Sequence, residues 1–495
     1  MATFQLTPHQ AGALDRLRAF SEEERSRCFV LRGYAGTGKT TLVGDFVRWL
    51  EERNVRAVLL ATTGRAAKVL AEKTGRPAAT IHSCIYRFDE LQGADAPEEK
   101  AGAQLSMQFG MRDRPDPGQK LVYIVDEASM IPNTATTGGQ VAQFGSGHLL
   151  KDFLAFTEGH RVVFVGDPCQ LPPVSDESFS PALSPRYLHE QYRVPVRYAE
   201  LSEIVRQDAH SEILQLAGRF RSDILQEKYQ RWPKLMVPRQ QSAHLYANEH
   251  ELIEAYLQRL KQRDYRDAIM ITNANGHCRR LNHRLRLNLL GDKQLQEEEL
   301  LMVVQNSYLV PLSNGDQVVV KEVKPAGKRA GFSFLKVKLL DLNRNETFET
   351  LLIRDLLYND YAGLQPEETQ RLLIDFNQRM RNAGVSPKSE VYREAMLKDP
   401  YLNALRAKFG YVITCHKAQG GEWPQVFLNI QKSVFVQRDN ALYRWFYTAL
   451  TRASQDLHFN DGFWVHGFNK RQPQVAIRQF KEQQRRKRGN KPPRP

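Results

Sequence analysis

The chain has 495 residues, a length that exceeds one ordinary hydrophobic core and predicts about two to four domains. Hydrophobic residues make up 41% and charged residues 25%, which is the usual composition of a folded globular protein. Lys and Arg number 70 against 56 Asp and Glu, and the resulting charge of +14 favours a polyanionic partner such as nucleic acid.

No stretch of the sequence approaches the roughly 20 apolar residues that a membrane-spanning helix needs. The first residues also lack the charged start and apolar middle of a secretory signal. The five cysteines are scattered and never spaced as CxxC, which argues against a disulfide framework and against a zinc site. We therefore expect a cytoplasmic protein without a membrane partner.

The N-terminal part alternates short apolar runs with helical patterns. Thr7 and Pro8 are typical of a helix start, with Thr7 as the N-cap. Strands are predicted at 28–31, 57–60, 121–125 and 162–165, and helices at 39–53 and from about residue 66. Short apolar strands that alternate with helices indicate a parallel sheet covered on both faces, whose site lies beyond the carboxyl ends of the strands.

Two segments interrupt this α/β pattern. A polar stretch with Gly, Pro and mixed charge runs from 86 to 120, and a second interruption contains Ser313-Asn314-Gly315-Asp316, a hairpin signal that suggests a small β-barrel. A charged helical stretch at 356–405 follows it. The predicted parts are a first α/β domain (1–85 and 121–196), its insertion (86–120), a second α/β domain (197–291 and 406–480), its insertion (292–405) and a basic disordered tail (481–495).

The segment Gly33–Thr40 matches the phosphate-loop pattern GxxxxGK[ST] at every fixed position and lies between a predicted strand and a predicted helix. Glycines allow backbone N–H groups to turn toward phosphate oxygens at a helix N-terminus. Lys39 is then expected to reach the β- and γ-phosphates, and the Thr40 hydroxyl to bind Mg²⁺. The nucleotide-binding candidates of this loop are Gly33, Gly36, Thr37, Gly38, Lys39 and Thr40.

Asp126 and Glu127 follow an apolar strand, as the second acidic motif of such a site would. Asp126 is expected to hold Mg²⁺, and Glu127 to activate the attacking water. An Asp-Glu pair after a strand is more often a helix cap, but the phosphate loop earlier in the chain favours the catalytic interpretation.

Together these motifs resemble those of the superfamily-one helicases, in the RecD-like and Dda-like branch, and the resemblance runs from Gln10 to Arg452. It implies an α/β fold with two RecA-like parallel-sheet domains around a P-loop NTPase core. It also implies a small pin or wedge insertion in the first domain and an SH3-like β-barrel insertion with a helical projection in the second.

The resemblance assigns roles to single residues. Gln10 resembles the adenine-reading glutamine of the Q motif, Gln170 the γ-phosphate sensor of motif III, Arg206 the nucleotide-facing arginine of motif IV, and Arg452 the arginine finger of motif VI. Gly420 and Glu422 of motif V are implied to contact the nucleotide. The residues implied to contact nucleic acid are Thr62, Thr63, Gly64, Arg65 and His82 in motifs Ia and Ib, and Thr414, His416 and Lys417 in motif V.

Aromatic and long apolar side chains are further candidates. Phe88, Met107 and Phe109 could form the wedge or be core residues. Tyr308 and Trp423 could stack on bases, but core packing is the favoured interpretation for either of them.

The expected function is that of a monomeric ATP-dependent DNA helicase or translocase, with ATP and Mg²⁺ bound between the two domains. Its expected partners are single-stranded DNA, junctions of single and double strands, and recombination or repair proteins. The resemblance implies 5′-to-3′ movement. Two alternatives stay open: an RNA helicase, and an ATP-switched DNA-binding subunit of a recombination or nuclease complex.

Overall fold

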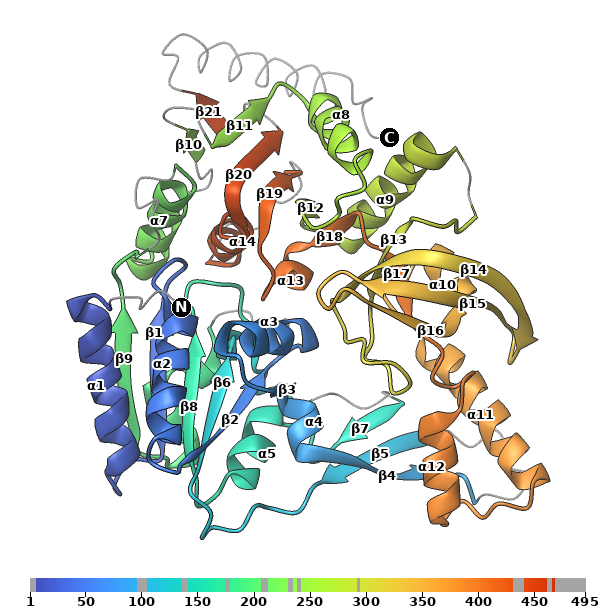
Figure 1. Cartoon of the computed structure of the whole chain (residues 1–495), viewed down its shortest axis with the longest axis horizontal. Helices are drawn as coiled ribbons and strands as arrows, with labels where there is room; N and C mark the ends of the chain where they lie inside the picture. The colour runs from blue at the N-terminus through green and yellow to red at the C-terminus, as the bar shows by residue number, and fades with distance from the viewer. Residues whose placement is uncertain are drawn as a thin grey trace, which may run out of the picture. The chain divides into compact units, whose positions relative to one another are not determined.

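The computed structural model of the chain forms two compact units, each assembled from separate pieces of sequence (Figure 1). The first unit comprises Met1–Ala209, Asn275–Val412 and His416–Gly421, and the second comprises His210–Ala274, Ile413–Cys415 and Glu422–Pro495. The chain therefore passes from one unit to the other five times. The structure describes residues 6–95, 105–135, 141–173, 179–205, 212–229, 235–237, 242–291, 294–430, 440–460 and 465–467. Arg206 and the predicted tail at 481–495 lie outside these residues.

A six-stranded sheet organises the N-terminal part of the first unit, and every neighbouring pair in it is parallel. Its strands are, in spatial order, β3 (Ala78–Thr80), β2 (Arg56–Ala61), β6 (Leu121–Asp126), β8 (Arg161–Gly166), β1 (Cys28–Gly33) and β9 (Val196–Leu201). The predicted strands at 28–31, 57–60, 121–125 and 162–165 are confirmed.

Both faces of this sheet are buried, as its apolar strands predict. Cys28 and Val30 of β1 pack into the core on one face, and Phe29 and Leu31 pack into the core on the other. The first face is covered by α4 (Ile81–Ile85), α5 (Leu149–Phe156) and α6 (Pro185–Tyr192), and the second by α1 (Pro8–Glu22), α2 (Lys39–Glu51) and α3 (Gly64–Thr74). Two short 3₁₀ turns, η2 (Ala128–Met130) and η3 (Pro181–Leu183), lie in the same part.

The domain boundary predicted after residue 196 needs correction. Strand β9 pairs with β1 along its whole length, from Cys28↔Val196 to Gly33↔Leu201, so the first sheet continues to Leu201. Only Ala199 and Leu201 of β9 are buried, because β9 is the edge strand of the sheet. The sequence therefore lacks the continuous apolar run that marks the inner strands.

The insertion predicted at 86–120 contains an antiparallel pair, β4 (Tyr86–Gln92) and β5 (Ser106–Met111). A third strand, β7 (Ala142–Phe144), comes from later in the chain and pairs with β5 in parallel. We refer to these three strands as the small sheet. Because β7 follows β6 in the sequence, the small sheet extends beyond the predicted insertion.

The second interruption forms a five-stranded antiparallel sheet in the first unit. Its order is β16 (Glu346–Ile353), β15 (Phe332–Asp341), β14 (Gln317–Arg329), β13 (Leu300–Val303) and β17 (Ala407–Phe409). The predicted turn is present, since Asp316 N–H donates to Ser313 O at 3.0 Å, but it belongs to a longer loop between β13 and β14. The helices of this Asn275–Val412 segment are α9 (Asn275–Leu290), α10 (Arg354–Tyr358), α11 (Pro366–Asn382) and α12 (Glu390–Lys398).

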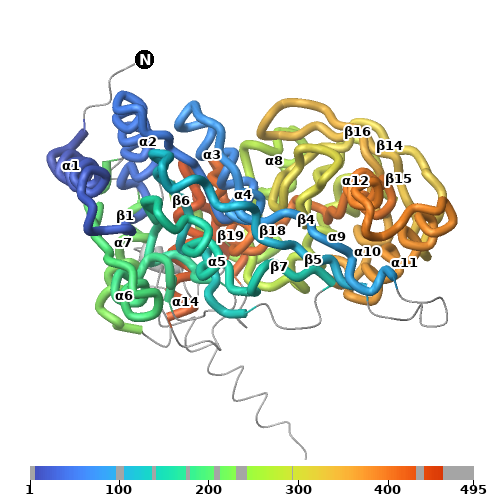
Figure 2. Tube along the Cα trace, turned by 90° about the horizontal axis from the view of Figure 1, so that it is seen from below, coloured from blue at the N-terminus to red at the C-terminus, as the bar shows by residue number. Residues whose placement is uncertain are grey.

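The small sheet and this helical segment share one apolar core. Leu91 and Leu105 pack with Phe376, Tyr392 and Met396 of α11 and α12. Figures 1 and 2 both show β4 and β5 extending to these helices. The two insertions of the first unit are therefore packed against each other.

The second unit contains another α/β sheet, ordered β11 (Ala243–Tyr246), β20 (Ala453–Asn460), β19 (Trp423–Leu428), β12 (Ala268–Thr272) and β18 (Val412–Thr414), and β11, β20, β19 and β12 pair in parallel. Its helices are α7 (Glu212–Leu225), α8 (Glu249–Leu260) and α14 (Asn440–Leu450), while the short α13 (Cys415–Ala418) lies where the chain changes units. A separate parallel pair joins β10 (Leu235–Val237) to β21 (Val465–Gly467). Among the described residues, no helix is both long and apolar enough to span a bilayer.

Candidate nucleotide and nucleic-acid site

The Gly33–Thr40 loop joins the carboxyl end of β1 to the first turn of α2. Gly36 and Gly38 adopt φ values of +77° and +78°, which side-chain-bearing residues rarely adopt. A Cβ atom on Gly33 would lie 2.6 Å from Lys39 Cγ, and one on Gly38 would collide with Gln10 Nε2. The glycines at these three positions are therefore required by the shape of the loop itself.

Lys39 folds back over this loop from the first turn of α2. Its Nζ donates to Tyr34 O at 3.1 Å, and Thr37 Oγ1 donates to the same oxygen at 2.8 Å. Thr40 follows Lys39 in the first turn of α2. The positive end of the helix and the lysine charge both lie at the loop, an arrangement that suits phosphate.

Gln10 supports the loop from the N-terminal helix. Its Oε1 accepts from Thr7 N–H at 3.0 Å, while Thr7 Oγ1 accepts from Gln10 N–H at 3.2 Å, so the predicted N-cap is part of a capping box. Gln10 Nε2 donates to Thr37 O at 3.1 Å, and the side chain is buried. The amide proposed to read adenine therefore also holds the phosphate loop.

Asp126 and Glu127 lie at the carboxyl end of β6, and β8 separates β6 from β1. Burial and the neighbouring Glu127 charge raise the pKa of Asp126 to about 6, and the charge of Lys39 opposes this rise. Asp126 Oδ1 accepts from Glu127 N–H at 2.8 Å, and Glu127 has φ of +50°, a strained value for this residue type. Two crowded carboxylates near a lysine fit a divalent cation, because its charge would offset the cost of burying theirs.

The loop after β8 carries the predicted sensor. Asp167 is fully buried and its Oδ1 accepts from Cys169 N–H at 2.9 Å, while Gln170 is also buried. Gln419 Nε2 donates to Leu171 O at 2.9 Å. This contact joins the Gln170 loop to the His416–Gly421 segment within the first unit. The sensor role of Gln170 stays a prediction.

The predicted motif Ia residues have structural roles at the start of α3. Thr63 Oγ1 caps this helix by accepting from Ala66 N–H at 3.2 Å, and Thr62 Oγ1 donates to Glu127 O at 3.4 Å. A Cβ atom on Gly64 would collide with the side chain of Ser313 in the β13–β14 loop, and Arg65 is mostly buried. Motif Ia therefore contacts both the catalytic segment and the antiparallel insertion.

His82 of α4 packs against the small sheet. Its ring lies 5.4 Å from the Phe144 ring in an edge-on arrangement and 5.8 Å from the Tyr86 ring. Burial lowers the pKa of His82, which favours the neutral form of the ring. A contact from His82 to nucleic acid would then use ring stacking or a neutral hydrogen bond.

Arg452 follows α14 in the second unit. Its Nε donates to Thr448 O at 3.0 Å and its Nη2 to Thr451 Oγ1 at 3.1 Å, and the side chain is mostly buried. Trp423 N–H donates to Arg452 O at 2.9 Å, but the Trp423 side chain is only 2% exposed. Trp423 is therefore a core residue, as the favoured interpretation of its sequence position predicts.

Comparison with known proteins shows which families with a phosphate loop this chain is similar to. Residues 5–232 match the family described as AAA domain, and residues 409–459 match the family described as UvrD-like helicase C-terminal domain. ATP-dependent DNA helicase Pif1 of Bdellovibrio bacteriovorus is 34% identical over 171 residues, which are 34% of this chain and 34% of that protein. ATP-dependent RecD2 DNA helicase of Deinococcus radiodurans is 30% identical over 175 residues, 34% of this chain and 18% of that protein.

The matched regions and the named relatives make this chain similar to the DNA helicases of the RecD and Pif1 branch of superfamily one. The alignments span about a third or less of these curated relatives. A solved structure of Bacteroides Pif1 bound to ssDNA is also similar, with 15% identity, a TM-score of 0.48 and coverage of 99% of each chain.

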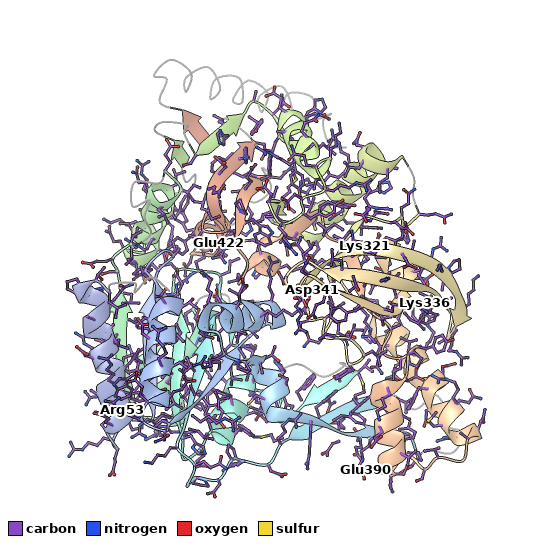
Figure 3. All side chains as sticks on the ribbon, viewed as in Figure 1. Arg53, Lys321, Lys336, Asp341, Glu390 and Glu422 are labelled. Carbon is purple, nitrogen blue, oxygen red and sulfur yellow. The ribbon has the colours of Figure 1, made fainter. Side chains whose placement is uncertain are left out.

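The first unit brings Gln10, Lys39 and Asp126 to one edge of the parallel sheet. The charge of Lys39 opposes the rise in the pKa of Asp126, and Gln10 donates a hydrogen bond to the loop that carries Lys39. Thr414, Glu422 and Arg452 lie in the second unit; Thr414 is mostly buried, and Glu422, labelled in Figure 3, is exposed. Gly420 has φ of +74° and belongs to the first unit.

Sequence reasoning missed an ion-pair cluster beside motif Ia. Lys68 of α3 donates to Asp316 and, at 3.0 Å, to Asp341, and both aspartates are fully buried. Figure 3 labels Asp341 at the end of β15. The turn Ser313–Asp316 was a visible signal for one partner, whereas nothing in the sequence marked Asp341.

A second missed feature is a cationic cavity of about 250 Å³ next to motif V. Lys417, Lys408 and Arg279 line it together with residues of α9 and α10. Burial lowers the pKa of Lys417, and burial together with the Lys417 and Arg279 charges lowers the pKa of Lys408 to about 8. Burial also lowers the pKa of His416.

Proposed function

We propose that this chain is an ATP-dependent DNA helicase that moves along single-stranded DNA in the 5′-to-3′ direction. The observation that carries the proposal is the arrangement of Lys39 and Asp126 at the carboxyl edge of one parallel sheet, in a chain that also matches the UvrD-like helicase C-terminal family. The named activity of the Pif1 and RecD2 relatives supports the same conclusion.

In the proposed reaction, the Gly33–Thr40 loop binds the phosphates of ATP through backbone N–H groups, and Lys39 neutralises the β- and γ-phosphates. Thr40 and Asp126 would hold Mg²⁺, which supplies further charge neutralisation. Glu127 accepts a proton from the attacking water. Gln170 senses the γ-phosphate, and Arg452 acts as the arginine finger that stabilises charge in the transition state.

The other predicted residues complete the two binding functions. Arg206, Gly420 and Glu422 are proposed nucleotide contacts. The proposed contacts to single-stranded DNA are Thr62, Thr63, Gly64, Arg65, His82, Thr414, His416 and Lys417. Because contacts to phosphates provide most of the binding energy, affinity for single-stranded DNA is expected to fall steeply as the salt concentration rises.

The proposal extends to the setting of the reaction. We infer a cytoplasmic, monomeric enzyme that acts on single strands and on junctions of single and double strands, with recombination or repair proteins as partners. The positive charge of +14 supports a nucleic-acid partner but does not select a pathway.

The test is unwinding of two partial duplexes, one with a 5′ and one with a 3′ single-stranded tail, in ATP and Mg²⁺. Glu127→Gln serves as the control without hydrolysis. Unwinding of the 5′-tailed substrate alone supports both the activity and its direction. Unwinding only of matched RNA substrates would move the assignment to RNA. DNA-stimulated hydrolysis without any unwinding would leave the ATP-switched subunit as the better function.

A further inference from the structure

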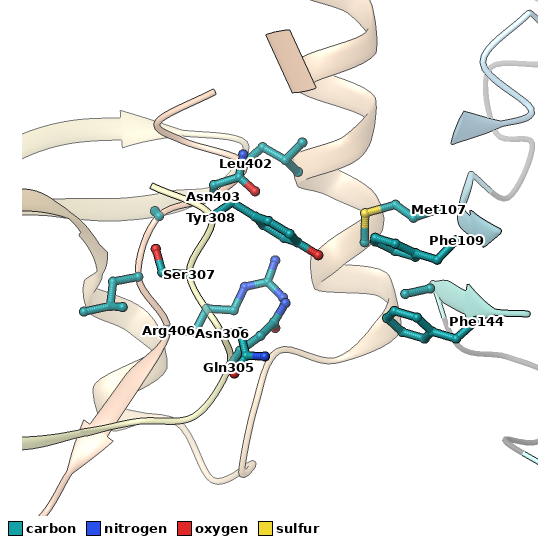
Figure 4. A pocket seen from close by; sticks show the side chains of 13 residues that line it. Met107, Phe109, Phe144, Gln305, Asn306, Ser307, Tyr308, Leu402, Asn403 and Arg406 are labelled. Atoms are coloured by element: carbon teal, nitrogen blue, oxygen red, sulfur yellow. The ribbon is translucent and has the colours of Figure 1, made fainter. Parts of the chain in front are cut away.

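A cavity of about 320 Å³ lies between the small sheet and the antiparallel insertion of the first unit (Figure 4). We call it the Tyr308 pocket. One wall comes from the small sheet and contains Met107, Phe109, Ala142 and Phe144. The other wall comes from residues 305–308 after β13 and residues 402–406 before β17.

The small-sheet wall presents ordered aromatic rings. Phe109 and Phe144 are stacked with ring centroids 4.4 Å apart and an interplanar angle of 16°, and Phe88 packs edge-on against Phe109 at 5.7 Å. Tyr308 projects from the opposite wall toward these rings, and 52% of its surface is exposed (Figure 4). An exposed aromatic ring facing a fixed aromatic wall suits a planar ligand, since flat rings gain from stacking.

The same pocket holds a cation without a matching acid. Arg406 donates from Nη1 to Gln305 Oε1, and none of the residues that line the pocket is acidic. Burial lowers the pKa of Arg406 to about 10, so the group remains charged at neutral pH. Arg406 is half-buried, so its charge is only partly screened by water and would attract a bound anion.

The pocket also adjoins the cationic cavity of motif V. Arg406 lines the Tyr308 pocket, and Lys408, two residues further along the chain, lines the cavity that contains Lys417. The two positions are about 6.6 Å apart along an extended strand. Positively charged side chains therefore extend from Lys417, a predicted nucleic-acid contact, to the aromatic pocket.

We infer that the Tyr308 pocket binds one nucleotide of the single strand, with its base between Tyr308 and the Phe109–Phe144 wall and its phosphate on Arg406. This inference rests on the proposed function. It joins Tyr308, a candidate for base stacking, to Arg406 and to an aromatic wall, neither of which the sequence connects to it. The stacked base gives the site its preference for unpaired nucleic acid, because a base within a duplex has both faces covered.

Binding of a labelled oligothymidylate without ATP tests the inference. Tyr308→Ala should weaken binding about tenfold, within the range for loss of one stacked base, while Tyr308→Phe should bind as the wild type does. Arg406→Gln should reduce the slope of log affinity against log salt by about 0.7, the value for one contact to single-strand phosphate. Tyr198→Ala and Arg344→Gln remove an exposed tyrosine and an exposed arginine elsewhere in the first unit and should change neither quantity.

An abasic strand separates the two halves of the site. On that strand Tyr308→Ala should match the wild type, while Arg406→Gln should keep its reduced slope. Equal binding by all variants, with normal binding by the wild type, would overturn the subsite and leave the helicase proposal standing. Tight binding of free thymidine monophosphate would instead identify a mononucleotide site, and failure of the wild type to bind any strand would overturn both proposals.

Discussion

Lys68 Nζ lies 3.0 Å from Asp341 Oδ2, and the same ammonium group donates to Asp316. One partly buried lysine of α3 therefore forms ion pairs with two fully buried aspartates of the antiparallel insertion. Burial raises the pKa of Asp316 despite the lysine, and the charge of Asp341 adds to this rise. The helix that carries motif Ia is thus fixed electrostatically to the insertion.

Lys68→Met should destabilise the first unit by about 3–5 kcal/mol, because it leaves two buried carboxylates without their cation. Urea unfolding followed by fluorescence would measure the loss. Lys73→Met removes an exposed lysine from the last turn of the same helix and should have little effect. Adding Asp316→Asn and Asp341→Asn to Lys68→Met should recover much of the stability, and no recovery would contradict the ion-pair explanation.

Gly64→Ala should lower stability by about 1–3 kcal/mol, because the new methyl group collides with Ser313 of the β13–β14 loop. Combining it with Ser313→Gly removes the colliding atoms, so the double variant should regain most of the loss. A double-mutant cycle measured by thermal unfolding provides the comparison. Additive losses would mean that the two residues do not touch.

Gln10→Ala should weaken binding of ATP and GTP to a similar extent, because Gln10 Nε2 supports the phosphate loop at Thr37 O. Loss of a typical hydrogen bond to the loop corresponds to about fivefold weaker binding. Titration of both nucleotides would show the effect. Weakened ATP binding with unchanged GTP binding would instead assign Gln10 to adenine reading alone.

Lys39→Ala should abolish hydrolysis while leaving single-strand binding largely intact, because it removes the phosphate-binding charge without altering the strand contacts. Arg452→Ala should lower the maximal rate by orders of magnitude with a modest change in ATP affinity. Steady-state hydrolysis with saturating single-stranded DNA measures both. Normal turnover by Lys39→Ala would overturn the assignment of the phosphate site.

The wild type should gain stability relative to Lys408→Met as the pH rises from 8 to about 10. Lys408 has a pKa of about 8 in the folded chain, below its ordinary value of 10.5, so the unfolded chain holds more protons across this interval. The free energy of unfolding of the wild type therefore rises with pH, and Lys408 is the cause of this rise. The difference in thermal midpoint between the two proteins, recorded at each pH, isolates Lys408, and a constant difference would contradict the shifted pKa.

The first sheet and its phosphate loop were predictable because their signals are local. Buried strands such as β1 and β6 are continuous apolar runs, and the loop glycines stand at fixed spacing from Lys39. The edge strand β9 was assigned to the wrong domain because its partly exposed side chains carry no such run. Local pattern therefore identified the inner strands and the catalytic edge.

Long-range pairings escaped prediction for a different reason. One of the two partners of β5 in the small sheet is β7, which is separated from it by the whole of β6, and Asp341 contacts Lys68 across 273 positions of sequence. A three-residue strand and a single aspartate look like surface residues when only their neighbours are considered. The Tyr308 pocket is of the same kind, since its walls come from four distant segments.

The chain crosses between its two units five times, and these crossings constrain the order in which the units can fold during synthesis. All strands of the first sheet lie between Cys28 and Leu201, so this sheet can form early during synthesis, before the remaining residues leave the ribosome. The second unit must wait, because β11 begins at Ala243 and its partner β20 ends at Asn460. A single cut between any two residues cannot release either unit whole, so a nicked molecule should keep its pieces together until it is denatured.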